Sequence, residues 1–298
     1  MMLKGLLDPK IDFIFKQIFG SMKHPAVLIS FLNATLKPIA LITQVDIKNT
    51  DLEKQFIKDK FSRLDIKATT SDNEIINIEI QLKNEYNMIK RSLYYWSKLY
   101  EEQLGEGEDY SELQRTVCIN ILNFKYLQND RFHNAYRLKE IVTHEQLCDT
   151  LEIHFIEIPK LQDNCDEKDM LVAWTEFLKN PESQRVRNLE MTFKEIREAK
   201  DELVRLSGDD EQRTLYNMRA KILRDEISAL GKAKREGIEE GIEEGIKKGI
   251  KKGIKEGIKE GELNKTLDIA KNALSIGLPL EQVKALTGLP EEVIKQLK

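Results

Sequence analysis

The chain has 298 residues, of which 33% are charged, and a formal net charge of −4. This near balance excludes a general electrostatic attraction for nucleic acid, so contact with DNA would need a local basic patch. The three cysteines are an odd number and share no metal-ligand spacing, which excludes a disulfide framework. No apolar run approaches the roughly 18 residues that span a bilayer, which excludes a membrane partner. With no apolar export signal at the N-terminus, we expect a cytoplasmic protein.

The chain is longer than one ordinary domain, so we expect a main core with an appendage. The sequence pattern changes character near residues 230 and 262. We therefore expect a mixed domain over 1–230, a glycine-isoleucine repeat over 231–262 and a small helical module over 263–298.

The first 60 residues predict two helices and a strand. Asp8 and Pro9 can begin the first helix, whose apolar residues recur at helical spacing at Ile11, Phe15, Ile18 and Phe19. A second helix is expected over 25–36, and residues 41–49 indicate a first strand.

Residues 63–83 organise the rest of the chain, because they alternate as a β-hairpin around the turn residues 71–73. A hairpin centred near Asp72 places Asp65 opposite Glu79, since position 72 is midway between them. The two faces of the second strand are Ile76, Ile78, Ile80 and Leu82 on one side, and Asn77, Glu79 and Gln81 on the other.

Two carboxylates directly across a strand pair repel each other unless a cation lies between them. A divalent ion such as Mg²⁺, bound by oxygen atoms of Asp65 and Glu79, would remove that repulsion. The alternative is a solvated hairpin face with scattered charges, and the spacing alone favours this alternative.

An Asp on one strand, a short turn, and Glu-x-Gln on the next strand form an arrangement that is similar to the motif of a known family. With its flanks DPKIDFIFKQIFG and LISFLNATL, the segment resembles the recombination-promoting nuclease (Rpn) and transposase family of the PD-(D/E)XK nuclease superfamily. The resemblance implies an α/β fold with a restriction-endonuclease-like core, a small mixed sheet flanked by helices, and a helical C-terminal extension. It also implies a metal-dependent DNA endonuclease. Asp65 and Glu79 would hold Mg²⁺ or another divalent cation, and Gln81 would orient a water or a phosphate oxygen.

The sequence departs from the superfamily pattern at Gln81, where a lysine is most common, although this family is similar in using glutamine. A basic group would then come from elsewhere, with Lys67, Lys83 and Lys16 as candidates. The missing lysine and the acidic net charge are the arguments for an alternative to this leading hypothesis. In that alternative, the chain is a catalytically silent oligomeric DNA-binding or regulatory protein on a nuclease-like fold.

The remaining core is expected to alternate helices and strands. We predict a helix over 84–104, strands over 116–124 and 151–158, and helices from 167 onward that include 183–206 and 209–230. The apolar stripe of the first of these helices is interpreted as core rather than as a base-stacking surface: Tyr86, Ile89, Leu93, Trp96, Leu99, Tyr100 and Leu104. His154 is interpreted as a structural residue.

Residues 236–261 repeat a four-residue Gly-Ile unit, with a glycine at every fourth position from 237 to 261. Each interior glycine costs a helix up to about 1 kcal/mol, so an isolated helix would be poor. Small residues four apart nevertheless let two backbones approach closely. We favour a partner-stabilised helix over the alternative, a low-complexity disordered linker.

Charges divide the repeat into an acidic half and a basic half. Five glutamates between 236 and 244 precede five lysines between 247 and 255. Antiparallel pairing of two copies would set each acidic half against a basic half, as a two-fold homodimer requires.

The last 36 residues predict short helices closed by Gly277 and Pro279 and by Thr287-Gly288. The segment is similar to helix-turn-helix modules. Glu291 and Glu292 would repel phosphate at the start of the last helix, so a dimerising or capping role is favoured over DNA reading.

Overall fold

The computed structural model describes residues 5–48, 66–166 and 168–297. Two compact units divide the chain, Met1–Arg224 and Asp225–Lys298, and they are described separately.

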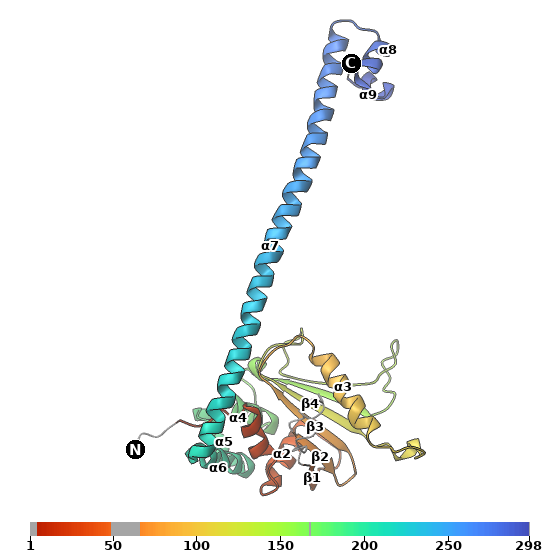
Figure 1. The fold of residues 1–298 in the computed structure, drawn as a ribbon. Coiled ribbons are helices and arrows are strands. Elements are labelled where there is room, and N and C mark those ends of the chain that lie inside the picture. The colour runs from red at the N-terminus through yellow and green to blue at the C-terminus, as the bar shows by residue number, and fades with distance from the viewer. Residues whose placement is uncertain (1–4, 49–65, 167, 298) are drawn as a thin grey trace. The chain divides into compact units, whose positions relative to one another are not determined.

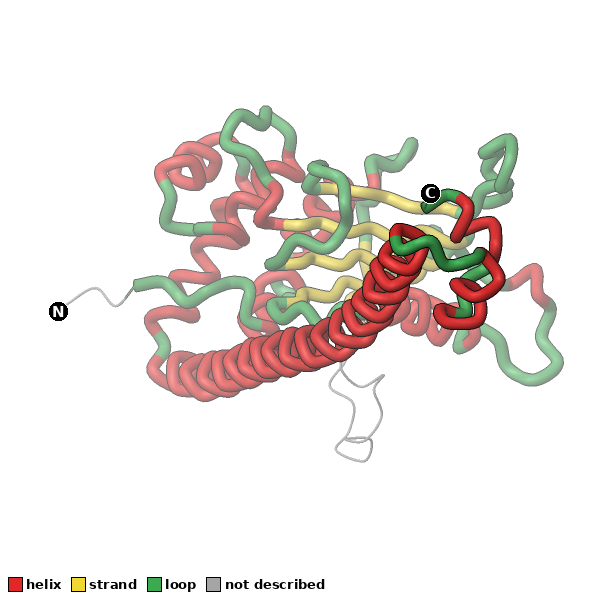
Figure 2. Tube along the Cα trace, turned by 90° about the horizontal axis from the view of Figure 1, so that it is seen from above, coloured by secondary structure: helices red, strands yellow, loops and turns green. Residues whose placement is uncertain are grey.

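A six-stranded mixed sheet forms the centre of the first unit, in the order β1-β2-β3-β4-β6-β5 (Figures 1 and 2). The three central strands β3, β4 and β6 are parallel, and the outer neighbours pair antiparallel. The strands are β1 Val45–Lys48, β2 Ile66–Thr70, β3 Ile75–Gln81, β4 Thr116–Leu122, β5 His133–Arg137 and β6 Leu151–Glu157.

Helices cover one face of this sheet and contribute most of the hydrophobic core. They are α1 Asp12–Phe19, α2 Pro25–Leu36, α4 Met170–Lys179, α5 Gln184–Thr192 and α6 Lys194–Gly208. Ile76, Ile78 and Ile80 of β3 belong to this core, as the alternation predicts. Phe19 lies at its centre, with its ring 5.5 Å from Phe31 and 5.2 Å from Trp174, both edge-on.

The opposite face is covered by α3 Met88–Glu101, which follows β3 and leads to β4 (Figure 1). Its buried side chains Met88, Tyr95 and Leu99 pack with Cys118 of β4 and Phe155 of β6. The short 3₁₀ helices η3 Tyr110–Glu112 and η4 Ile158–Lys160 lie in the connections before β4 and after β6.

The predicted apolar stripe on residues 84–104 is partly wrong. Tyr86, Ile89 and Leu93 are 62%, 48% and 43% exposed. The buried face of α3 instead includes Met88, Ser92, Tyr95 and Leu99. The polar residue Ser92 belongs to this buried face. A prediction from the spacing of apolar residues alone therefore assigned the wrong face of the helix to the core.

The expected helix over 183–206 is also two helices rather than one. The chain is extended at Phe193, with φ −112° and ψ 115°, and this residue ends α5 and begins α6. No glycine or proline stands at the junction, so the sequence carries no local signal for it.

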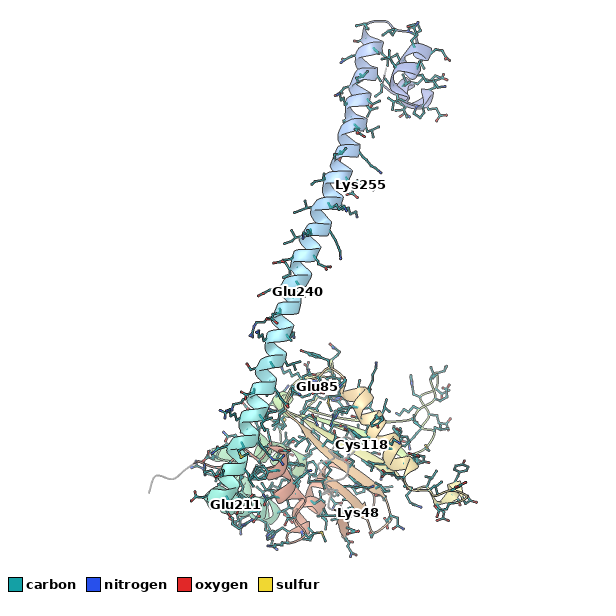
Figure 3. All side chains as sticks on the ribbon, viewed as in Figure 1. Lys48, Glu85, Cys118, Glu211, Glu240 and Lys255 are labelled. Carbon is teal, nitrogen blue, oxygen red and sulfur yellow. The ribbon has the colours of Figure 1, made fainter. Side chains whose placement is uncertain are left out.

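The long helix α7 Asp210–Ser275 starts in the first unit and includes the whole glycine-isoleucine repeat. Glu240 and Lys255 project from this helix in Figure 3. In the second unit, α7 is followed by α8 Leu280–Thr287 and α9 Glu291–Lys295, whose apolar residues form a small core with the end of α7. Gly277 and Gly288 have φ of +87° and +68°, the left-handed conformation that glycine adopts without strain.

Candidate functional site

The register of the β2–β3 hairpin confirms the predicted centre. Ile66 pairs with Ile78 and Ala68 with Ile76, so the midpoint is position 72. Asn73 supplies the left-handed turn conformation, with φ +59°, which asparagine tolerates better than most residues. Asp65, the predicted first carboxylate, lies outside the described residues.

Glu79 lies on β3 with its side chain only 1% exposed, on the face covered by α3. The Arg91 guanidinium of α3 donates from Nε to Glu79 Oε2 at 3.1 Å. Among the described residues, the second carboxylate oxygen, Oε1, has no hydrogen-bond partner. A buried carboxylate with one oxygen left unbonded is costly, so this atom is a position where a further donor or cation would stabilise the fold.

Burial raises the pKa of the Glu79 carboxyl above its ordinary value, while the charge and hydrogen bond of Arg91 act to lower it. The Asn77 side chain is close enough to lower this pKa as well, although it makes no hydrogen bond of good geometry to Oε1. The pKa of the Arg91 guanidinium is raised because Glu79 stabilises its charged form, although its own burial opposes this. Burial also raises the pKa of the neighbouring Cys118 thiol, and the charge of Glu79 adds to that rise. The region around Glu79 is therefore one in which a second positive charge would be favoured and a second negative charge disfavoured.

Asn120 and Ser92 connect the site-bearing strand pair to α3. Asn120 stands opposite Glu79 on the neighbouring strand β4. Its Oδ1 accepts from the Ser92 hydroxyl at 2.8 Å, and its Nδ2 donates to the carbonyl of His154 at 3.0 Å. Since Arg91 and Ser92 are adjacent on α3, this buried contact fixes the part of the helix that carries the guanidinium.

Gln81 ends β3 and lies half-buried, two residues from Glu79 and therefore on the same face. Its backbone carbonyl accepts from the Asn123 amide at 2.9 Å, which joins the carboxyl ends of β3 and β4. The amide side chain of Gln81 offers one oxygen acceptor and two N–H donors near the buried carboxylate.

The candidate lysines have other positions or partners. Lys67 pairs with Glu102 at 3.2 Å, and Lys83 pairs with Glu85 at 2.7 Å. Lys16 belongs to α1, which packs on the opposite face of the sheet from Glu79. The cation closest to Glu79 in the described part of the chain is Arg91, which the sequence reasoning did not assign to the site.

A model of the PD-(D/E)XK nuclease family transposases matches residues 9–233. The chain belongs to this family. Its sheet and flanking helices are the PD-(D/E)XK core, as the hairpin and its flanks predicted, and membership supports a nuclease-like function. Searches of curated proteins and of solved structures gave no match.

Members of this nuclease superfamily typically use divalent metal ions. In the part of the chain that the structure describes, no three His, Cys, Asp or Glu side chains form a metal cluster. The residues present nonetheless fit such an ion, because the unbonded Glu79 Oε1 is a hard anionic oxygen and the Gln81 amide supplies another oxygen. None of the helices in the described ranges combines the length and apolar character needed to cross a bilayer.

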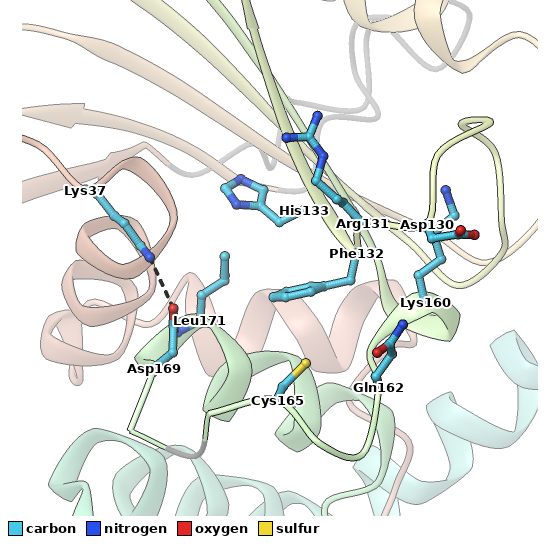
Figure 4. Close-up of a pocket in the computed structure, with 10 residues that line it drawn as sticks. All are labelled: Lys37, Asp130, Arg131, Phe132, His133, Lys160, Gln162, Cys165, Asp169 and Leu171. Carbon is cyan, nitrogen blue, oxygen red and sulfur yellow. Dashed lines mark hydrogen bonds and ion pairs between the residues drawn. The ribbon is translucent and has the colours of Figure 1, made fainter.

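A cavity of about 480 Å³ beside α4 and the start of β5 is a separate feature of this nuclease-family fold (Figure 4). Two of its lysines are neutralised by carboxylates: Lys37 pairs with Asp169 at 3.1 Å, and Lys160 pairs with Glu157 at 2.7 Å. His133 also lines the cavity.

His133 connects this cavity to a buried polar network on the outer strands. Its Nε2 lies 2.9 Å from His154 Nδ1, and His154 Nε2 lies 2.6 Å from a carboxylate oxygen of Glu152. Arg115 and Arg137 bind the other oxygen of Glu152, so the network joins the segment just before β4 to β5 and β6. His154 thus has the structural position expected of it.

A second cavity of about 770 Å³ lies at the turn end of the hairpin, near the end of α3. Lys67, Glu102, Glu108 and Glu112 line it, so carboxylates outnumber cations there. Glu79 lines neither cavity. An acidic cavity of this kind is a poor match for phosphate, which leaves the surroundings of Glu79 as the better candidate.

Proposed function

We propose that this protein is a metal-dependent DNA endonuclease of the recombination-promoting, transposase-like type. The observation that carries the proposal is the buried Glu79 carboxylate, which has one oxygen on Arg91 and the other without a partner among the described residues. It lies on β3 one residue beyond Ile78, which pairs with Ile66 of β2.

Glu79 and Asp65 would hold the ion, which when bound supplies a water of lowered pKa and positive charge for the scissile phosphate. Gln81, being neutral, orients a water or a phosphate oxygen through hydrogen bonds. Arg91 holds the Glu79 carboxylate in one orientation and places a permanent positive charge beside it. In this way Arg91 takes over part of the electrostatic role of the lysine that the motif lacks at position 81.

The outward face of α3 is suited to DNA contact. Tyr94 is 43% exposed, and Ile89 and Leu93 of the same helix are exposed as well. Lys90 adds positive charge to the same helix, and Lys98 does so in an exposed ion pair with Glu101 at 3.3 Å. Cations near exposed aromatic rings can bind the phosphate backbone and stack on unpaired bases, so we assign DNA binding to this helix.

Plasmid cleavage with and without Mg²⁺ tests the proposal. Glu79→Gln and Asp65→Asn each remove an anionic ligand with little change in volume, and each should abolish cleavage. Glu106→Gln is the matched control, because this glutamate is exposed in the loop after α3. Unchanged cleavage in either site variant would refute the metal assignment.

An absence of cleavage by the wild-type protein at every divalent ion tested would favour the alternative function. The protein would then be a catalytically silent, oligomeric DNA-binding or regulatory protein, with Arg91 serving as the permanent partner of Glu79. DNA binding that persists without cleavage, and that is unaffected by Mg²⁺, would establish this alternative.

We also propose that the protein is a homodimer through the glycine-isoleucine repeat in residues 236–261. Sedimentation of the full chain and of a chain ending at Gly231 tests this. Identical sedimentation states would mean that the repeat serves only as a tether.

A further inference from the structure

A row of six isoleucines runs along α7 without a partner in the described part of the chain. Each is 53–58% exposed, a large fraction for so regular an apolar set: Ile238, Ile242, Ile246, Ile250, Ile254 and Ile258. Their spacing of four residues makes them one ridge of the helix surface.

A row of glycines forms a groove beside this ridge. Each glycine from 237 to 257 precedes an isoleucine. A methyl group added at any glycine from 237 to 261 would meet no atom within 4 Å. Seven interior glycines at up to about 1 kcal/mol each make this a weak helix by itself. A partner that fills the groove would offset that cost.

We infer that the partner is a second copy of α7, antiparallel, with its two-fold axis between Gly245 and Ile246. In this register, residue n of one helix faces residue 491 − n of the other, so that Gly245 faces Ile246. Every glycine of one helix from 237 to 253 then faces an isoleucine of the other, as Gly241 faces Ile250. Isoleucine ridges therefore enter glycine grooves, which lets the two backbones approach closely along the paired segment.

The charges select the same register independently. All five glutamates of the acidic half face lysines, at pairs 236–255, 239–252, 240–251, 243–248 and 244–247. A shift by one repeat unit in either direction sets Lys247 against Lys248, or Glu243 against Glu244. Parallel, in-register helices would place glycine on glycine and like charge on like charge throughout.

This inference rests on the proposed homodimer and specifies its geometry. Disulfide cross-linking of the full-length chain tests it, with Cys148 and Cys165 changed to serine and the buried Cys118 kept. A mixture of the Ile242→Cys and Gly249→Cys proteins should give a cross-linked pair under mild oxidation. Ile258→Cys alone should not cross-link, because position 258 faces position 233 of the other copy in this register and would face itself in a parallel dimer.

Charge variants provide a second measurement. Glu243→Lys with Glu244→Lys should weaken dimerisation about tenfold, since several modest ion pairs become repulsions. Mixing this protein with the Lys247→Glu, Lys248→Glu variant should restore association. Glu260→Lys with Glu262→Lys is the matched control outside the paired segment and should leave association unchanged.

The outcomes separate the register from the dimer itself. A dimer that cross-links through Ile258→Cys, or that fails to cross-link at 242 and 249, refutes the register while the homodimer stands. A full-length chain that sediments as a monomer refutes both. Nuclease activity is measured separately and decides neither result.

Discussion

Replacing Arg91 with methionine removes the positive charge that compensates Glu79 and keeps most of the side-chain volume. Removing one partner of a buried ion pair costs roughly 3–5 kcal/mol, because the remaining charge is left uncompensated. Glu79 is 1% exposed but Arg91 is 24% exposed, so the expected loss in the free energy of unfolding is near the lower limit, about 3 kcal/mol.

A double-mutant cycle isolates the ion pair from the other contacts of Arg91. The guanidinium also lies 4.9 Å from the Tyr95 ring, and that contact is lost in both backgrounds. In a Glu79→Gln background the cost of Arg91→Met should therefore fall by about 2 kcal/mol. Urea unfolding measures each variant, with the exposed Arg187→Met as control.

Magnesium provides the decisive comparison. If the ion binds at Glu79, it supplies the charge that Arg91→Met lacks, so saturating Mg²⁺ should stabilise this variant more than the wild type. An ion present at one hundred times its dissociation constant contributes about 2.7 kcal/mol. If Arg91→Met costs the same free energy of unfolding with Glu79 and with Gln at position 79, the ion pair is not a stabilising contact. If the unfolding midpoint of the Arg91→Met protein does not change with Mg²⁺, the proposed metal site at Glu79 is refuted.

Three further predictions concern other parts of the molecule. Gln81→Lys restores the commoner superfamily charge and should retain measurable plasmid cleavage; a loss equal to that of a ligand variant would show that neutral glutamine is required. Burial, followed by the charges of His154, Lys37 and Arg131, lowers the pKa of His133 to about 4. The unfolded chain therefore takes up this proton first as the pH falls from about 6.5 towards 4, and stability is lost within that window. His133→Asn should reduce the loss in free energy of unfolding between pH 6.5 and pH 5 by about 1–2 kcal/mol, with the exposed His144→Asn as the substitution control. Sedimentation should show that Gly245→Leu with Gly249→Leu weakens dimerisation more than adding roughly 0.5 M salt, which screens exposed ion pairs. A larger effect of salt than of the leucines would show that charge rather than packing dominates the affinity.

The sequence predicted the hairpin and its register because local alternation determines both. A turn at 71–73 and an isoleucine at every second position of β3 leave one pairing that buries the apolar face. Helix α2 was likewise predicted with its observed bounds, since Pro25 and the apolar run that follows it are local signals.

The features that the sequence did not predict depend on contacts between distant segments. Strand β5, HNAYR, has no clean apolar alternation, and its position at the sheet edge follows from pairing with β6. Arg91 was assigned to a helix but not to the site, because its distance from Glu79 depends on how α3 is rotated over the sheet. That rotation is set by the buried Ser92–Asn120 hydrogen bond, which hydrophobic periodicity cannot reveal.

The parallel pairing of the central strands has a consequence for when the site can first form during protein synthesis. Ile75 pairs with Thr116, and Thr116 pairs with Leu151, so 41 (116 − 75) and 35 (151 − 116) positions separate neighbours in the sheet. Parallel neighbours need a crossover connection, and such long-range closures are slow compared with a hairpin. A ribosome-bound chain that ends before Thr116 can form the hairpin but lacks β4, whose Asn120 stands beside Glu79. The buried environment of Glu79 therefore arises only in chains that have been made and folded through β4, which confines the proposed chemistry to chains that have passed this stage of synthesis.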